Sequence, residues 1–262
     1  MSRAVAALVL AGAPNEGPLR AVSDCAYEAL IEVAGRPMVE YVLDALRAAP
    51  SVGPIGIVGP VADLKAAVRL EGEELIEPAG GLLDNVARGA ERLTESGDRL
   101  LVVTGDIPLL TPGAVEDFLA RCRRRPAGLD ACYPMVSREV AEAQFPGQTR
   151  TYVRLREGLF TGGNCVLLSP EVLLRQRSLF EQAVALRKNP VGMARLLGAG
   201  FIVSFLLKRL SAADIERVIR DRLGINGAII AVPHAEIGFD VDKPADLELA
   251  RRMLEDGRPG TG

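Results

Sequence analysis

An aspartate follows a strongly apolar stretch near the middle of the sequence. Asp106 comes after the apolar run 100–104 and Gly105, and Pro108 stands two residues further on. If the run forms a buried strand, the glycine releases the carboxylate at a sheet edge, which is where open α/β sheets bind their ligands. Mg²⁺ prefers a few carboxylates together with phosphate oxygens. Asp106 is therefore a candidate metal ligand, although a Gly-Asp pair is equally common in a simple turn.

Two more aspartates stand close together towards the end of the chain. Asp240 and Asp242 lie two residues apart, just before a helix that Pro244 would open. In extended backbone their side chains point the same way, so either one could be a second metal ligand. Asp242 could instead only cap the helix that follows it. The residues alone leave both interpretations open.

A glycine- and proline-rich loop follows the first apolar run of the chain. It begins with Leu10, Ala11 and Gly12 and continues through Gly17 to Arg20. Glycines let backbone amides approach phosphate oxygens, and an arginine can pair with those oxygens. Any tight loop needs glycine, so phosphate binding is one of two interpretations here. The loop matches neither G-x-x-x-x-G-K-[ST] nor G-x-G-x-x-G, which excludes the two best-known nucleotide-binding loops.

Composition excludes several classes of protein. The 262 residues carry 31 basic and 34 acidic side chains, a formal charge of −3, which argues against a dedicated nucleic-acid binder. The single histidine, His234, excludes a metal site made of several histidines. Four scattered cysteines without C-x-x-C spacing argue against zinc fingers and disulfide frameworks.

Short apolar runs alternate with segments of helical period, which is typical of an α/β protein. We predict a single Rossmann-like three-layer α/β/α domain over residues 1–255, with a mostly parallel mixed sheet, an excursion on the substrate side at about 136–225, and a disordered tail at 256–262. The predicted strands are 4–10, 55–59, 100–104, 131–135, 152–155, 165–168 and 228–232. The predicted helices are 37–46, 82–93, 112–123, 170–186, 212–223 and 244–254.

No stretch of the sequence is long and apolar enough to span a bilayer. The longest late apolar run, 196–207, has 12 residues and contains two glycines, whereas a spanning helix needs about 20. The N-terminus carries no recognisable targeting signal. We therefore expect a cytoplasmic protein without a transmembrane segment.

Taken in order, these motifs resemble the nucleotidyltransferases of glycosyltransferase-A-like fold. That family includes sugar-1-phosphate nucleotidyltransferases and the MobA-like NTP transferases, which attach a nucleotide to the molybdenum cofactor. The segments that carry the resemblance span nearly the whole chain: 8–12, 29–42, 80–86, 105–111, 163–164 and 242–247. The resemblance implies the glycosyltransferase-A-like fold.

The resemblance also implies a reaction and a set of site residues. In this family a phosphate oxygen of the acceptor attacks the α-phosphate of a nucleoside triphosphate, and pyrophosphate leaves with the help of Mg²⁺. The partners would be a nucleoside triphosphate and a small phosphorylated acceptor, a sugar phosphate or a molybdenum-cofactor type, and a homo-oligomer is compatible with the sequence. The implied roles are Mg²⁺ ligands for Asp106, Asp242 and Asp240, catalysis for Arg20 and Asp106, nucleotide binding for Leu10, Ala11, Gly12, Arg20, Glu28, Gly81, Asn85 and Gly105, and acceptor binding for Gly163 and Asn164.

One position departs from the family pattern by a reversal of charge. The family has lysine directly before the block that starts at Ala29, whereas this chain has Glu28. With 27 arginines and 4 lysines in the chain, a simple preference for arginine would put arginine there. A carboxylate about 4 Å from a phosphate oxygen costs about 4 kcal/mol at an effective dielectric constant near 20.

Three explanations for Glu28 are open. The side chain faces solvent while Arg20 or Arg36 supplies the positive charge, or it binds a metal ion itself, or the protein has kept binding and lost transfer. The last explanation predicts a catalytically weakened module that binds a nucleotide or a nucleotide sugar.

Overall fold

The computed structural model describes residues 4–95, 98–148, 150–186, 198, 201 and 209–256. The tail beyond 256 and all of the apolar run 196–207 except residues 198 and 201 lie outside this part, so what we expect of them remains a prediction. Among the described helices, none has the length and apolar character needed to cross a membrane. The described cysteines at 25, 122, 132 and 165 are all free thiols.

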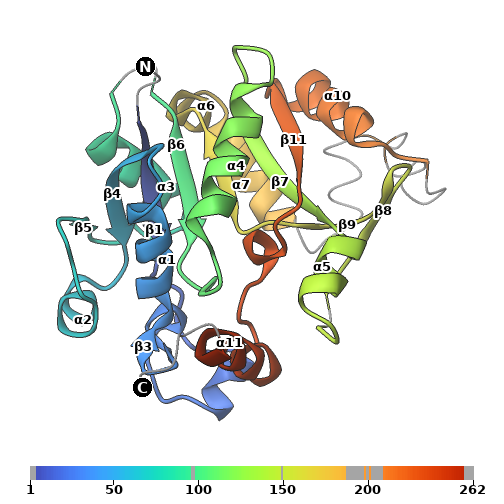
Figure 1. Ribbon diagram of the computed structural model, residues 1–262. Helices are drawn as coiled ribbons and strands as arrows, with labels where there is room; N and C mark the ends of the chain where they lie inside the picture. Colours follow the sequence, from blue (N-terminus) through green and yellow to red (C-terminus); the bar gives the residue numbers. More distant parts are fainter. Residues whose placement is uncertain are drawn as a thin grey trace.

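A mixed sheet of nine strands forms the middle of the molecule (Figure 1). Its strands follow each other in the order β5-β4-β1-β6-β10-β7-β9-β8, and β11 pairs with β7. Their bounds are β1 Val5–Leu10, β4 Val52–Val58, β5 Glu74–Ile76, β6 Leu100–Thr104, β7 Ala131–Ser137, β8 Val153–Leu155, β9 Gly158–Gly162, β10 Cys165–Leu168 and β11 Gly227–Val232. The short strands β2 (Glu32–Val33) and β3 (Arg36–Pro37) form a separate pair.

The strands divide into a parallel half and an antiparallel half. β5, β4, β1 and β6 are parallel neighbours, and β11 runs parallel to β7. β10 is antiparallel to both β6 and β7, and β9 is antiparallel to β7 and β8. In the parallel half Leu10 pairs with both Val58 and Thr104, so the carboxyl ends of β1, β4 and β6 lie at one edge. That edge is where such a sheet binds ligands.

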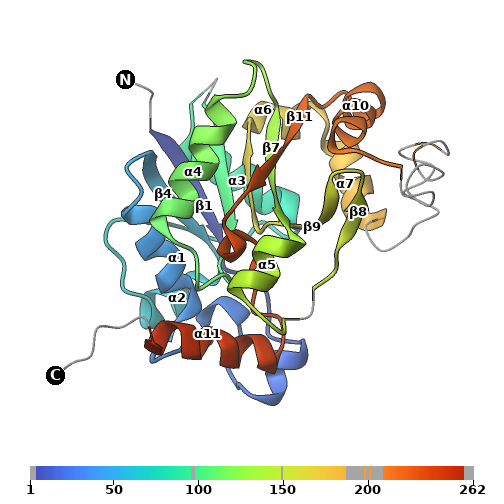
Figure 2. The same cartoon turned by 45° about the vertical axis from the view of Figure 1, so that its right-hand side comes forward.

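Helices cover both faces of the sheet, as Figure 2 shows for α1 and α4 in front of β1 and α3 behind it. The helices are α1 Met38–Arg47, α2 Val61–Ala67, α3 Leu82–Leu93, α4 Pro112–Arg123, α5 Arg138–Gln144, α6 Pro170–Arg175, α7 Arg177–Leu186, α10 Ala212–Leu223 and α11 Pro244–Asp256, with the 3₁₀ turns η1 Pro18–Ala21, η2 Glu28–Leu30 and η3 Ala235–Gly238. Val9 of β1 packs with Val42 of α1 and Phe118 of α4, whereas its neighbour Leu8 packs with Val86 of α3. Alternate residues of β1 thus fill the two core layers, which confirms the predicted three-layer α/β architecture.

Local signals explain where several helices start and stop. α4 begins at Pro112 because the hydroxyl of Thr111 accepts the amide of Ala114. α10 ends at Gly224, which has the left-handed φ of 63° that favours glycine. The helix predicted over 170–186 is divided in two, because Gln176 leaves the helical conformation with φ −121° and ψ 25°.

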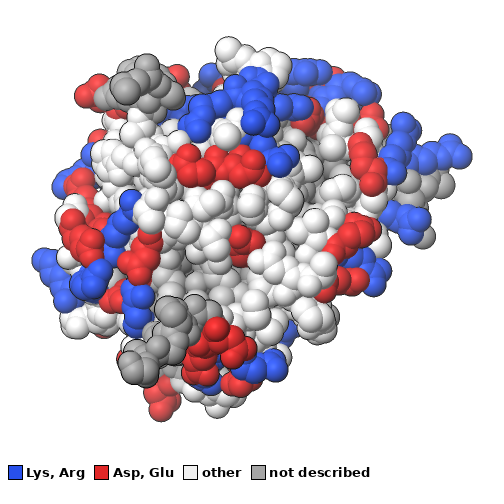
Figure 3. Space-filling model, in the orientation of Figure 1, with Lys and Arg blue, Asp and Glu red and all other residues white. Residues whose placement is uncertain are grey.

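Charged side chains of both signs are interspersed on the face shown in Figure 3, and much of its centre carries no charge. Among the described residues many charged side chains are paired with each other, for example Arg125 with Glu216 and Arg121 with Asp117. Surface pairs of this kind contribute little to stability, so burial of the two apolar layers carries the fold.

Candidate active site

The loop after β1 and the turn after β6 are joined directly at the sheet edge. The amide of Gly105 donates a hydrogen bond of 2.9 Å to the carbonyl oxygen of Leu10. A Cβ atom on Gly105 would lie 2.9 Å from the Cβ of Ala29 and 3.1 Å from that same carbonyl oxygen. Only glycine fits there. As a result, the loop after β1, the block that starts at Ala29 and the turn after β6 meet immediately before Asp106.

The structure brings the three predicted metal carboxylates together. The amide of Val241, which lies between Asp240 and Asp242, donates a 3.0 Å hydrogen bond to the carbonyl oxygen of Asp106. Burial, followed by the negative charges of Asp240 and Glu28, raises the pKa of Asp106 to about 6. Burial and the charge of Asp240 likewise raise the pKa of Asp242 to about 6. Each carboxylate disfavours the charge of the others, so the cluster favours a bound cation.

An unpartnered carboxylate oxygen supports a cation at this place, because the Oδ1 atom of Asp106 is buried without a hydrogen-bond partner. In the described part of the chain, no set of three or more His, Cys, Asp or Glu side chains converges closely enough to hold a metal ion unaided. Two carboxylates completed by substrate phosphates suit Mg²⁺, which keeps few protein ligands. Asp106 and Asp242 therefore fit a Mg²⁺ ion that arrives with a nucleotide.

A cavity of about 720 Å³ opens beside these carboxylates. Its walls come from η1 and η2, from Tyr133 of β7, from the end of β9, from the segment before β8 and from the start of α11 with the residues before it. Charged groups line it together with neutral polar ones: Glu28, Arg150, Asp240, Asp242, Lys243 and Asp246, and Gln148, Thr151, Thr161 and Asn164. The cavity can bind a small ligand that carries both hydroxyl groups and charge.

Glu28 lies at this cavity. Its amide is hydrogen-bonded to the carbonyl oxygen of Ala13 over 3.0 Å, which fixes it against the loop after β1. One carboxylate oxygen would lie 3.4 Å from a Cβ atom built on Gly17. Burial and the charge of Asp242 raise the pKa of Glu28. Glu28 therefore faces the cavity and is partly buried there, which favours the explanations in which its carboxylate belongs to the site.

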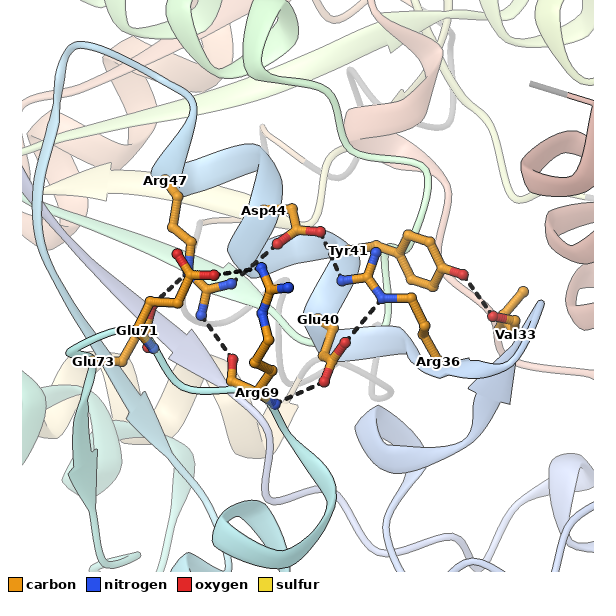
Figure 4. A network of polar contacts seen from close by, with 9 residues as sticks. All are labelled: Val33, Arg36, Glu40, Tyr41, Asp44, Arg47, Arg69, Glu71 and Glu73. Atoms are coloured by element: carbon orange, nitrogen blue, oxygen red, sulfur yellow. Dashed lines mark hydrogen bonds and ion pairs between the residues drawn. The ribbon is translucent and has the colours of Figure 1, made fainter. Parts of the chain in front are cut away.

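The two arginines considered as substitutes for the lysine lie elsewhere. Arg36 donates to Glu40 over 2.9 Å and to Asp44 over 2.7 Å, in the polar network on α1 that Figure 4 shows. Arg20 donates over 2.8 Å to the carbonyl oxygen of Asp24, and about half of its side chain is exposed. Neither arginine lines the cavity, so in this conformation neither replaces the missing charge.

The other predicted nucleotide residues lie at the adjoining part of the edge. Gly12 lines a second, smaller cavity of about 320 Å³ together with Tyr27 and residues 60–63 and 77–78. Gly81 stands directly before α3, and its amide reaches the carboxylate of Asp84 over 3.3 Å. The side-chain oxygen of Asn85 accepts the amide of Ala79 over 2.6 Å, so this side chain holds the loop before α3.

The acceptor motif lies at a break between two strands. The amide of Gly163 donates to the carbonyl oxygen of Pro134, and the amide of Asn164 donates to that of Ile237. A Cβ atom on Gly163 would lie 2.7 Å from side-chain atoms of both Pro134 and Ile237. The carbonyl oxygen of Asn164 in turn accepts the amide of Thr104 over 3.0 Å. Asn164 thereby lies against the end of β6, directly before the turn that carries Asp106, and it lines the same cavity as Asp240 and Asp242.

Sequence reasoning missed Arg150. Its Nη2 atom donates to Asp240 over 2.9 Å, its Nε atom donates to Gln148 over 2.9 Å, and its side chain is only 10% exposed. The sequence gives no signal for this residue, because a single arginine in a polar segment has no periodicity or motif. Its partner lies 90 residues away in the sequence. Lys243, which also lines the cavity, was passed over within the last motif.

This site and fold are those of a nucleotidyltransferase, an enzyme class that the comparisons support. A family model described as the MobA-like NTP transferase domain matches residues 26–218. The chain therefore belongs to the MobA-like NTP transferase family. A 3-deoxy-manno-octulosonate cytidylyltransferase of Anaeromyxobacter sp. (strain Fw109-5) is 28% identical over 233 residues, which cover 87% of this chain and 90% of that protein.

Solved structures agree with the assignment. A hypothetical transferase from Thermus thermophilus is 39% identical, with a TM-score of 0.80, and covers 93% of this chain and 99% of its own. A CMP:2-keto-3-deoxy-manno-octonic acid synthetase in complex with CTP is 19% identical, with a TM-score of 0.63, and covers 98% of this chain and 100% of its own. At that identity the second likeness shows the fold alone, which confirms the predicted fold family.

Proposed function

We propose that this nucleotidyltransferase moves a nucleoside monophosphate from CTP to a small anionic acceptor of the sugar type and releases pyrophosphate, with Mg²⁺ bound at Asp106 and Asp242. The observation that carries the proposal is one cavity, next to Asp106 at the end of β6, that brings the carboxylates of Glu28 and Asp242 together with Arg150 and several neutral polar side chains. The names of the cytidylyltransferase relatives support cytosine as the base.

The protein's own residues prepare the reaction in three ways. Close packing at Gly105 holds the turn that carries Asp106 against the loop after β1, and the triphosphate would lie along this edge. Asp106 and Asp242 would hold Mg²⁺, which offsets negative charge on the α-phosphate and on the leaving pyrophosphate. Asn164 and the cavity behind it would hold the acceptor in line with the α-phosphate, because a fixed geometry removes much of the entropy cost of bringing two substrates together.

The acceptor side fits a polyhydroxylated molecule with one negative group. Gln148, Thr151, Thr161 and Asn164 offer neutral hydrogen-bonding groups for hydroxyls, and Arg150 offers the charge. A volume of about 720 Å³ lies within the usual range for small-molecule sites. Both a sugar phosphate and a sugar acid meet this description. The octulosonate in the name of the relatives is a sugar acid.

Pyrophosphate release tests the proposal. The protein is incubated with each of the four ribonucleoside triphosphates, Mg²⁺, and two acceptor panels, one of sugar phosphates and one of 3-deoxy sugar acids. We expect release with CTP and an acceptor from one panel, and none after Mg²⁺ is chelated. No release with any pair, from a protein that is folded and binds CTP, contradicts the proposal.

That last result would favour a second candidate, a nucleotide-binding module without transfer. The observation behind it is that Glu28 lies at the cavity while neither Arg20 nor Arg36 does. Neither arginine then replaces the lysine that the family has at position 28. The Glu28 variant in the Discussion separates the two candidates.

A further inference from the structure

The guanidinium of Arg150 is held rigidly inside the cavity. Asp240 accepts a hydrogen bond from its Nη2 and Gln148 accepts one from its Nε, each over 2.9 Å. The group lies 5.8 Å from the ring centre of Phe239. A side chain that is only 10% exposed has lost most of its hydration. A charge in such surroundings needs partners, and Asp240 is the one charged partner bonded to it among the described residues.

The three aspartates of the cluster differ in their partners. Asp240 is bonded to Arg150, whereas no arginine of the described ranges bonds to the carboxylate of Asp106 or Asp242. Asp106 also has a buried oxygen with no hydrogen-bond partner at all. Asp240 is thus occupied by a cation that belongs to the protein, and the other two carboxylates remain available for a metal ion.

We infer that the cluster divides into two functional pairs: Asp106 and Asp242 hold the metal, while Asp240 is a positioning residue that presents Arg150 to a carboxylate or phosphate group of the acceptor. This assignment rests on the proposed function and deepens it, because it names the group by which the acceptor is recognised. It also decides between Asp240 and Asp242 as the second metal ligand.

The chemistry of arginine suits this role. A guanidinium has five N–H donors in a plane, and the bonds to Asp240 and Gln148 use two of them and fix that plane. A fixed fork loses little entropy when it binds the two oxygens of a carboxylate or phosphate. The neutral side chains of Thr151, Thr161 and Asn164 around the cavity can bind the rest of a sugar-like acceptor.

Metal binding tests the division without any need for turnover. Mn²⁺ is titrated into the wild-type protein and the variants Asp240→Asn and Asp242→Asn, and the free ion is followed by electron paramagnetic resonance. We expect Asp242→Asn to weaken Mn²⁺ binding by about tenfold or more and Asp240→Asn by no more than about threefold, because only a direct ligand contributes a full charged bond. Equal losses in the two variants would overturn the assignment of Asp240.

Steady-state kinetics test the role of Arg150 and Asp240 in acceptor binding. Arg150→Gln should raise the acceptor KM by about 10- to 100-fold and leave the KM for the triphosphate within about twofold, and Asp240→Asn should raise the acceptor KM less. Arg150→Lys should restore affinity for a phosphate but not for a carboxylate, which needs the planar fork. Arg251→Gln, which removes an exposed arginine of α11 away from the cavity, is the matched control.

Failure of the proposed function and failure of the roles assigned to Asp240 and Arg150 give different results. If the wild-type protein reacts with no acceptor, the proposed function fails, and the Mn²⁺ titration still decides whether Asp240 is a metal ligand. If the wild-type protein is active and Arg150→Gln leaves the acceptor KM unchanged, the proposed function stands and the role of Arg150 is refuted.

Discussion

The amide of Val241 donates a 3.0 Å hydrogen bond to the carbonyl oxygen of Asp106. This bond joins the turn after β6 to the segment before α11, two parts of the chain that are far apart in sequence. Because Val241 stands between Asp240 and Asp242, the bond also sets how closely these carboxylates approach Asp106. The geometry of the acidic cluster therefore depends on backbone, and side-chain variants can remove charges from it without dismantling the fold.

Replacing Asp106 with Asn should abolish transfer and leave the fold intact. We expect pyrophosphate release to fall by about a thousandfold or more, equivalent to about 4 kcal/mol in the barrier, because the metal loses a charged ligand. In the absence of metal, the variant should melt at the same temperature as the wild type or higher. Because the pKa of Asp106 is higher in the folded than in the unfolded state, keeping this carboxyl ionised at neutral pH lowers stability, and asparagine avoids that loss. Unchanged pyrophosphate release would remove Asp106 from the site.

Replacing Glu28 with Lys should tighten triphosphate binding. The carboxylate lies at the cavity close to Asp242, so the change removes one negative charge and adds a positive one beside the phosphates. We expect the Kd for CTP, measured by titration at fixed Mg²⁺, to fall by about tenfold or more. Glu28→Gln removes the negative charge without adding a positive one, so its Kd for CTP should lie between those of the wild type and of Glu28→Lys.

The rate of the Glu28→Lys variant separates the two candidate functions. If the wild-type protein is inactive and the variant releases pyrophosphate, the natural protein is a binding module. If the wild-type protein is active and the variant loses that activity, Glu28 is a working part of the site, which agrees with its second explanation as a metal ligand.

Replacing Gly163 with Ala should damage both stability and transfer. A new Cβ atom would lie 2.7 Å from side-chain atoms of Pro134 and Ile237, so the link between β9 and β10 must shift. We expect a loss of about 1–3 kcal/mol in the free energy of unfolding, measured with urea, and a rise in the acceptor KM. Gly113→Ala is the control, because nothing lies within 4 Å of its Cβ position in α4 and alanine favours a helix. Equal stability of the two variants would contradict the role of close packing at Gly163.

Replacing Glu73 with Gln should destabilise the protein at neutral pH and have less effect in acid. Burial would raise the pKa of Glu73, but the 2.6 Å hydrogen bond and the charge of Arg47, together with hydrogen bonds from backbone amides, outweigh burial and the net shift is downward. The stabilisation is therefore present above the unfolded-state pKa of the carboxyl and is lost as the pH falls through the lower folded-state value. We expect Glu73→Gln to lower the free energy of unfolding, measured with urea, by about 1–3 kcal/mol at pH 7. This difference between the variant and the wild type should shrink below about pH 4.

The network in Figure 4 offers a matched control for that experiment. Glu71 is about half exposed and lies 3.9 Å from Arg47, so Glu71→Gln should cost well under half as much as Glu73→Gln. A gap between Glu73→Gln and the wild type that stays constant from pH 7 to pH 3 would show that the carboxylate charge does not carry the effect.

Elements with strong start and stop signals were predictable from the sequence. α3, α4 and α10 have the predicted bounds, and their ends are set by local residues such as the cap at Thr111 and the left-handed Gly224. β9 (Gly158–Gly162) was missed because the glycines at both of its ends weaken the strand pattern. It exists because β7 and β8 pair with it on either side, which is a tertiary effect.

The candidate site was predictable only on the side of the metal. Asp106 follows a predicted strand and Asp240 and Asp242 precede a predicted helix, and the resemblance of their motifs to those of the family assigned all three to one site. The structure brings them together. Arg150 reaches the same place from a polar segment before β8 and depends on its bond to Asp240. A contact of that kind leaves no local signature, so a single sequence does not reveal it.

The pairing of β11 with β7 also has a consequence for how the molecule assembles in time. β11 is the last strand of the sheet to leave the ribosome, and the segment with Asp240 and Asp242 follows it. A nascent chain that ends at Val232 already contains Asp106, the whole apolar layer around Leu8 and most of the layer around Val9, but neither Asp240 nor Asp242. The three carboxylates can therefore meet only after most of the hydrophobic core has been synthesised, which postpones the least favourable contacts of the fold to its final step.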